Sequence, residues 1–216
     1  MKNSEYFKKE IQYIKNPIIR NIVIKTLDNS KEYIVHIPAS SSGKYHPSYA
    51  LGEGGLMRHI KATIGIANSL IESNIFANYL YNFKVFYCND SLDYYADCVY
   101  SALLLHDICK ADDTPEHQTR FDHPLLAGKL FYSTALAYIQ NNDTISAYDK
   151  ERLQSSTIPT IKSAIESHMG QWNVSRDKKI RLPLPKKPIE HFVHMIDYLA
   201  SRKQVEFNFN DGVKDV

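Results

Sequence analysis

Residues of the kinds that bind metal ions stand in three separate stretches of the chain: His59, the adjacent pair His106 and Asp107, and Asp197. The pair follows an apolar run in SALLLHDICK, at the end of an expected helix. Buried imidazoles and carboxylates need partners, and a divalent cation would supply one. A mixed His/Asp set suits Mn, Fe, Co, Ni or Zn better than Mg or Ca. These residues predict a transition-metal centre that leaves coordination positions open for water and substrate, as hydrolysis requires.

Two further histidines, His123 and His168, lie between these ligands in the chain and could hold a second ion. His168 continues the inward spacing of Ile161 and Ile165. Simpler roles exist for each candidate taken alone. An inward histidine can be an ordinary core residue, an aspartate can cap a helix, and a histidine in a last helical turn favours the helix dipole. Such roles do not explain why all of these residues occur together, so one or two ions per chain are expected.

Residues that could contact a substrate flank the metal candidates. A Ser/Gly-containing loop with Lys44, Tyr45 and His46 precedes the first ligand and could close over the site. Trp172, the single tryptophan, could stack on a base or fill the core. His194 stands three residues before Asp197 and is expected to support it. A basic loop between His168 and Asp197 could attract phosphates or could simply be solvated: Arg176, Lys178, Lys179, Arg181, Lys186 and Lys187. The predicted substrate-binding set is Lys44, His46, Trp172, Lys178, Lys179 and Arg181.

The elements that must position these residues are predicted to be helices. In 55–73, Leu56, Ile60 and Ile64 follow the 3.6-residue period, which places His59 on or beside the buried stripe. Further helices are expected over 3–15, 17–27, 94–109, about 123–140, from Thr157 to 168, and 188 to about 203, and 76–83 is expected to form a turn or a helix. Loops are expected over 39–54, 110–122 and 173–188. The alternation in 31–39 suggests a short extended piece. The sequence therefore predicts an all-α fold with at most a minor strand.

Length and composition favour one domain. The chain has 216 residues, and a boundary between 59 and 197 would divide the metal site. We expect an N-terminal segment over 1–44, a core over 45–203 and a polar tail over 204–216. The net charge of +2 is too small to indicate a nucleic-acid binder by field alone. The N-terminus lacks an apolar signal core, no apolar run approaches the ~18 residues of a membrane span, and the three cysteines form no CxxC motif. These features favour a cytoplasmic protein without a membrane partner.

Three segments together resemble a known family. GGLMRHIKAT, LLLHDICK and HMIDYLASR resemble the H…HD…D signature of the HD-domain metal-dependent phosphohydrolase superfamily, over roughly residues 45–203. The resemblance implies metal ligation by His59, His106, Asp107 and Asp197. HDICK is similar to the common HDIGK, with Cys109 in place of glycine, so the turn after the pair can differ. Lys110 matches a lysine that often approaches the phosphate, where it could neutralise developing charge. Its alternative role is a solvated cation at a helix end.

The two additional histidines refine this resemblance. FDHPLLAGK and ESHMGQW resemble the settings of the extra histidines in binuclear HD phosphodiesterases. The overall order is similar to the HD domain of YhaM-type 3′–5′ exoribonucleases. The resemblance implies that Asp107 bridges two ions and that a metal-activated hydroxide cleaves a phosphodiester.

The substrate is left open by these motifs. We expect a nucleotide, a cyclic nucleotide or a short oligonucleotide, because no nucleic-acid-binding domain that would suit long RNA is evident. One alternative is a mononuclear phosphohydrolase of dNTPs or nucleoside monophosphates. Another is a nucleotide-sensing HD module that does not turn over substrate. The oligomeric state is not indicated by the sequence.

Overall fold

The protein folds as helices, as the sequence predicts. The computed structural model describes residues 1–40, 43–83, 91–112, 114 and 118–205. Within those ranges there is no sheet, and the extended contacts are two isolated bridges, Ala111 with Thr119 and Val174 with Arg181. The α-helices are α1 (Lys8–Ile11), α2 (Pro17–Asp28), α3 (Gly55–Glu72), α4 (Ile75–Asn82), α5 (Leu92–Leu105), α6 (His123–Gln140), α7 (Ala147–Arg152), α8 (Ile158–Ser167) and α9 (Pro188–Ala200). Short 3₁₀ helices are η1 (Asn3–Phe7), η2 (Glu32–Val35), η3 (Ser48–Ala50) and η5 (Gly170–Trp172).

Local side-chain chemistry sets where several helices begin. Asn16 accepts the backbone N–H groups of Ile18 and Ile19 at the start of α2, and Ser91 accepts that of Tyr94 in α5. Both contacts satisfy amides that have no partner inside the helix. At the start of α9, Glu190 accepts the N–H groups of Lys186 and Lys187 at 2.7 and 3.1 Å. These caps fix the helix starts from local sequence.

Helix α5 lies at the centre of the bundle and is buried from Tyr95 to Leu105, and α8 packs against α5, α6 and α9. Helix α3 packs against α5 and α9, and α2 packs against α5 and α6. The apolar interior includes the fully buried Phe131, Ile165, Phe192 and Leu103. Burial of each such side chain contributes about 1.5–3 kcal/mol. This core holds the helices firmly enough to fix the positions of side chains at their ends.

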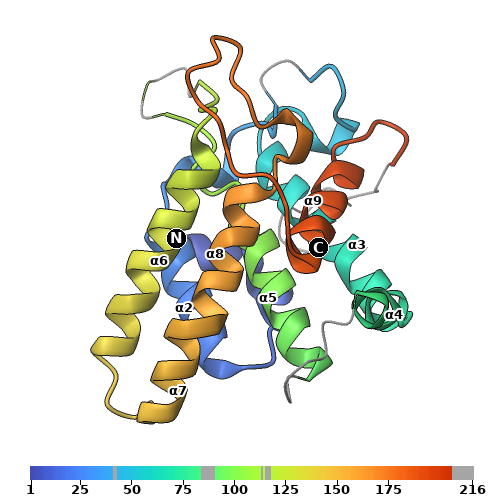
Figure 1. Cartoon of the computed structure of the whole chain (residues 1–216). Helices are drawn as coiled ribbons and strands as arrows, with labels where there is room; N and C mark the ends of the chain where they lie inside the picture. The colour runs from blue at the N-terminus through green and yellow to red at the C-terminus, as the bar shows by residue number, and fades with distance from the viewer. Residues whose placement is uncertain (41–42, 84–90, 113, 115–117, 206–216) are drawn as a thin grey trace.

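The helix ends that carry the metal candidates meet at one end of the bundle. Figure 1 shows the C-terminal ends of α5 and α8 and the N-terminal ends of α3 and α6 toward the upper part of the molecule, with α7 at the opposite end. The described parts of the 39–54, 110–122 and 173–188 loops also lie at the upper end (Figure 1). Residues far apart in the sequence are therefore gathered under a common set of loops.

Three details differ from the sequence-based expectations. The expected extended piece at 31–39 contains the 3₁₀ helix η2 instead, because Tyr33, Ile34 and Val35 all bury themselves within one tight turn. The expected helix 3–15 is divided into η1 and α1 and ends at Ile11. Thr157 does not cap α8, because its backbone is already helical at φ −65° and ψ −52°.

The segment before α8 is helical from Ala147 onward. It contains α7 and then a wider π-helical stretch, η4 (Leu153–Thr157), that leads directly into α8. Pro159 stands just after this stretch and lacks the N–H of a regular α-helical turn, which accounts for the altered winding. Among the described residues, no helix combines the length and apolarity needed to cross a membrane. Cys88 and nearly all of the 204–216 tail lie outside the described residues.

Candidate metal centre

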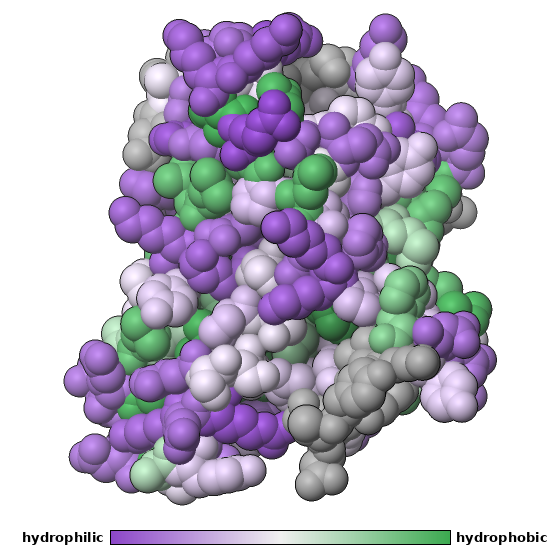
Figure 2. Space-filling view, in the orientation of Figure 1, coloured by the Kyte–Doolittle hydropathy of each residue, from purple (hydrophilic) through white to green (hydrophobic). Residues whose placement is uncertain are grey.

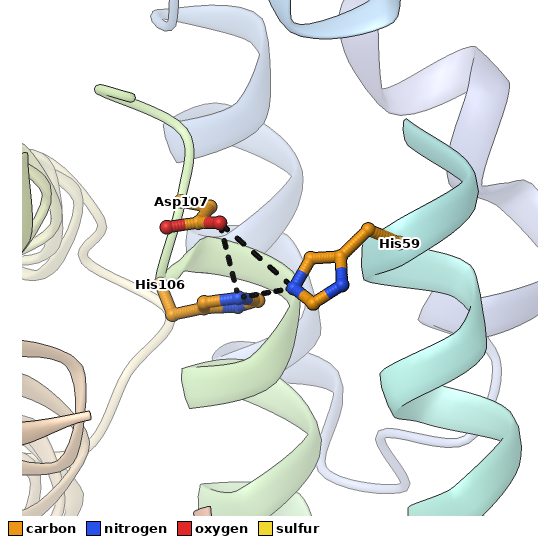
Figure 3. Close-up of side chains that lie close together, drawn as sticks. All are labelled: His59, His106 and Asp107. Atoms are coloured by element: carbon orange, nitrogen blue, oxygen red, sulfur yellow. Dashed lines mark hydrogen bonds and ion pairs between the residues drawn. The ribbon is translucent and has the colours of Figure 1, made fainter. Parts of the chain in front are cut away.

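The first cluster joins residues from α3, α5 and α9. His59 lies near the start of α3, His106 directly follows α5, and Asp197 lies near the end of α9. His59 Nε2 lies 3.3 Å from His106 Nε2 and 3.0 Å from Asp197 Oδ1, and His106 Nε2 lies 3.6 Å from Asp197 Oδ1. Figure 3 shows His59 and His106 reaching from separate helices toward Asp107. The first cluster is His59, His106, Asp107 and Asp197.

The second cluster joins Asp107 to the start of α6 and the end of α8. His123 Nε2 lies 2.9 Å from Asp107 Oδ1, and His168 Nε2 lies 3.5 Å from the same oxygen. The two imidazole Nε2 atoms lie 3.3 Å apart. All three residues are about 1% exposed, so their polar atoms cannot form hydrogen bonds with bulk water. The second cluster is therefore Asp107, His123 and His168.

Asp107 belongs to both clusters and gives one oxygen to each. Its Oδ1 faces His123 and His168, whereas its Oδ2 lies 3.5 Å from His106 Nε2 and 3.9 Å from His59 Nε2. Adjacent residues in a regular helix point in different directions, but α5 ends at Leu105 and a turn follows. The turn lets His106 and Asp107 reach the same place. This arrangement would let one carboxylate contact a cation in each cluster.

Three of the histidines are held with Nε2 pointing into the clusters. His106, His123 and His168 each bond through Nδ1 to the backbone carbonyl three residues earlier, at 2.7, 2.6 and 2.8 Å. A carbonyl only accepts, so each Nδ1 carries the proton. Such contacts orient metal-binding histidines and fix their tautomer. His59 differs, because its buried Nδ1 has no partner within the described part of the chain.

The second cluster lacks a donor at its centre. With its proton on Nδ1, an unprotonated imidazole presents a lone pair at Nε2, and the Asp107 oxygen near His123 and His168 also only accepts. Three acceptors within 3.5 Å of one another repel unless a cation lies between them. Two nitrogens bound to one ion at about 2.1 Å would lie about 3.0–3.4 Å apart at octahedral or tetrahedral angles. The observed spacing of 3.3 Å fits that requirement in both clusters.

The charges around the clusters are also compatible with a cation. Burial alone would raise the pKa of Asp107, but Lys110 and the neighbouring histidines hold it well below its usual value. His59 and His106 likewise offset the effect of burial and keep the pKa of Asp197 well below its usual value. Burial lowers the pKa of His123 to about 4, so this ring is neutral at pH 7. The buried Asp107, the partly buried Asp197 and the neutral imidazole of His123 are ligand types suited to a divalent ion.

The two neighbouring carboxylates act on His106. Burial would lower its pKa, but Asp107 and Asp197 together raise it. A proton on His106 then partly balances the two carboxylates. An ion that binds in the first cluster would therefore compete with a proton on His106.

Lys110 contributes the other nearby positive charge. Its Nζ lies 3.0 and 2.9 Å from the two oxygens of Asp107. The lysine side chain is 15% exposed, so it lies between the buried carboxylate and solvent. This position allows contact with a group that approaches the clusters from outside. The solvated helix-end role considered for Lys110 does not describe its position.

His46 is the loop residue that the structure brings to the centre. Its ring centroid lies 6.2 Å from that of His59. Burial, with His59 and Lys110 nearby, lowers the pKa of His46 to about 4. Its Nδ1 is buried without a partner among the described residues. Lys44 is exposed, and its Nζ lies 5.2 Å from the Tyr45 ring centroid.

The basic loop forms its own hairpin-like turn near the same end of the bundle. Leu182 N–H donates to Asn173 O at 2.8 Å, and Ser175 N–H donates to Ile180 O at 3.0 Å. Lys178, Lys179 and Arg181 are exposed, and the surface over this loop is largely hydrophilic (Figure 2). Lys179 pairs with Asp177 at 3.6 Å. In the described part of the chain, no hydrogen bond or ion pair joins these three side chains to the clusters.

Trp172 does not fill the core, because it is 44% exposed. It follows the His168 segment in η5 and stacks on Tyr198 of α9. His194, expected to support Asp197, instead bonds through Nδ1 to the backbone oxygen of His168 at 2.7 Å, with Gln171 Oε1 3.1 Å from its Nε2. It therefore connects α9 to the end of α8.

Sequence reasoning missed the role of Arg58. Its guanidinium donates to the carbonyls of Tyr49, Leu51 and Glu53 at 2.6, 2.9 and 2.9 Å. Arg58 thus holds the loop that carries His46 against the start of α3, beside His59. An arginine directly before a candidate ligand was the available signal, but its carbonyl partners depend on how the loop folds back.

No known protein family, no curated protein and no solved structure matches this chain. The structure itself shows an all-α protein with buried His/Asp clusters that could hold one or two metal ions.

Proposed function

We propose that this protein is a metal-dependent phosphohydrolase of the HD-domain type, acting on phosphodiesters. The observation that carries the proposal is the division of Asp107 between two histidine pairs, with Oδ1 2.9 Å from His123 and Oδ2 3.5 Å from His106. A carboxylate shared in this way suits two adjacent divalent cations. Such ions would activate water and support both the attacking and the leaving oxygen of a phosphoryl transfer.

The protein's own residues supply the remaining requirements of that reaction. The backbone bonds of His106, His123 and His168 preorganise the ligand nitrogens. Lys110, at the partly exposed side of Asp107, places an ammonium where a phosphoryl oxygen would approach. His46 offers a neutral imidazole nitrogen beside His59 for a hydrogen bond to the substrate. The surrounding burial keeps water from competing for these groups.

The substrate class proposed is a small nucleotide, a cyclic nucleotide or a short oligonucleotide. A small phosphate ester matches a centre with one adjacent lysine and an exposed basic loop at the same end of the bundle. The net charge of +2 supports a small ligand better than long nucleic acid, whose binding depends on many cationic contacts. The proposed metals are Mn, Fe, Co, Ni or Zn, because imidazole predominates among the ligands.

Substrate hydrolysis after metal reconstitution tests the proposal. Chelated protein would be reloaded separately with Mn, Co, Ni and Mg and assayed against cyclic nucleotides, dinucleotides and dNTPs. We expect transition-metal-dependent cleavage, faster for diesters than for triphosphates. Strong dNTP hydrolysis without diester cleavage would favour the mononuclear alternative, and metal binding without any turnover would favour a sensing module.

A double variant, H106A/D107A, provides the matched loss-of-site test. It should lose metal and activity while it keeps an all-α circular dichroism spectrum. His191→Ala is the control, because His191 is an exposed histidine on α9 outside both clusters. Unchanged metal content in the double variant would overturn the assignment of the ligands.

A further inference from the structure

An exposed aromatic stack is formed by residues close in sequence to two of the metal candidates, His168 and Asp197. The rings of Trp172 and Tyr198 are nearly parallel, with an interplanar angle of 11° and centroids 5.5 Å apart. The Arg202 guanidinium lies 4.4 Å from the Tyr198 ring centroid and 5.7 Å from that of Trp172. Trp172 is still 44% exposed in this stack. The indole therefore offers a rigid, planar and accessible surface next to a positive charge.

Specific contacts hold this stack in place. Gly170 adopts a positive φ of 54°, which turns the chain after α8 toward α9. A Cβ at this position would overlap the His194 ring, so the turn and α9 approach each other too closely for another residue. His194 donates to His168 O at 2.7 Å and lies 6.1 Å from the Trp172 ring centroid. The exposed tryptophan is thus held by its contacts with Tyr198 and His194.

The stack is built from the same two segments that carry metal candidates. On α9, Tyr198 directly follows Asp197 and stands four residues after His194, so it shares a helix face with His194. On the other segment, Trp172 stands four residues after His168. Each half of the stack is therefore positioned by a backbone that also positions a metal candidate. A substrate held by the metal centre through its phosphate could therefore place a planar group against the Trp172–Tyr198 stack.

We propose that the Trp172–Tyr198 stack, with Arg202, is a subsite that binds the base of the substrate. This inference rests on the proposed function and adds to it that the substrate carries a planar nucleobase next to the phosphate that is cleaved. Stacking on aromatic rings accepts any base, because every base has a π face. The arginine adds a cation beside the rings, which favours an anionic nucleotide over a free base. The subsite would therefore favour substrates that carry a base, whichever base it is.

Fluorescence of Trp172, the single tryptophan in the chain, tests this inference directly. Full-length protein purified without chelator would be titrated with adenosine 5′-monophosphate, ribose 5-phosphate and inorganic phosphate, with selective excitation of tryptophan. None of these titrants is a phosphodiester, so the proposed activity does not consume them. We expect saturable quenching by the nucleotide and none by ribose 5-phosphate, which differs by lacking the base. Equal responses to the nucleotide and ribose 5-phosphate, or no response to either, would overturn the subsite.

Calorimetry on variants separates stacking from an indirect effect. Trp172→Ala should weaken nucleotide binding roughly 5- to 100-fold, whereas Trp172→Phe should retain most of the affinity. Tyr148→Ala is the matched control, because Tyr148 is an exposed aromatic on α7 at the opposite end of the bundle, and it should have no effect. Unchanged nucleotide affinity in Trp172→Ala would contradict the inference.

The outcomes also separate this inference from the proposed function. Metal-dependent diester cleavage without base-dependent quenching would leave the proposed function in place and reject the subsite. Base-dependent quenching in a protein that neither binds metal nor hydrolyses any phosphoester would support the subsite and reject the proposed function.

Discussion

His194 donates a hydrogen bond from Nδ1 to the backbone oxygen of His168 at 2.7 Å, and this contact joins the two halves of the metal centre. His168 belongs to the second cluster, and His194 shares α9 with Asp197 of the first. A change in the distance between α8 and α9 would therefore alter both clusters together. The contact depends on the absence of a side chain at Gly170, where a Cβ would overlap the His194 ring.

Gly170→Ala should destabilise the protein by about 1–3 kcal/mol, because alanine meets both the positive φ and the His194 ring. The variant should also bind metal more weakly, since α9 must shift to relieve the overlap. Thermal or urea unfolding and metal titration measure the two effects. Gly65→Ala is the control: it lies in the exposed middle of α3 with open space around it and should stabilise the helix by up to about 1 kcal/mol. Equal stability of the two variants would contradict this account of the turn.

Lys110→Ala should lower kcat about 100-fold and change KM much less, because the ammonium is expected to act mainly on charge that develops during the reaction. Loss of metal would not explain this result. Removal of a cation 2.9 Å from Asp107 should leave metal affinity intact or increase it. Steady-state kinetics with a cyclic nucleotide and a parallel metal titration test both statements. Lys129→Ala, at an exposed position on α6, is the control. An increase in KM with unchanged kcat would instead assign Lys110 to ground-state binding.

Metal binding by the first cluster should weaken in acid. Asp107 and Asp197 raise the pKa of His106 above its usual 6.5 in the metal-free protein, despite burial. Below that raised pKa an ion must displace a proton, so affinity should fall by up to about tenfold per pH unit. In the second cluster, His123 has a pKa of about 4 and stays neutral through the same range. Equilibrium dialysis with Co²⁺ from about pH 8 to about pH 5 should show one ion lost before the other. Simultaneous loss of both ions would contradict this assignment of protons.

The sequence predicts the fold well where helices are long and periodic. The helix expected over 55–73 occurs as Gly55–Glu72, and the one expected to restart near His123 runs to Gln140. The helix at Ala147–Arg152 was missed because it contributes no buried residue and so has no apolar period. Its signal was local: Ser146 caps it by accepting the N–H of Asp149.

The metal centre was predictable in its residue types but not in how they share ligands. Spacing alone places His59 and His168 on inward helix faces. It does not reveal that Asp107 gives a separate oxygen to each cluster, because that depends on the turn after Leu105. The exposure of Trp172 could not be predicted from the sequence either, since it depends on how α9 passes beside Gly170. Contacts between distant segments are fixed by packing rather than by local pattern.

Anomalous diffraction from crystals of Mn²⁺-loaded protein tests the central claim most directly. The account predicts two Mn²⁺ peaks per chain, about 3.5–4 Å apart, with one oxygen of Asp107 on each ion. One ion should bind His59, His106 and Asp197, and the other should bind His123 and His168. His123→Ala or His168→Ala should reduce the two peaks to one. A single ion in the unaltered protein, with both His123 and His168 more than about 4 Å from it, would contradict the two-metal centre, since a ligand nitrogen lies about 2 Å from its metal.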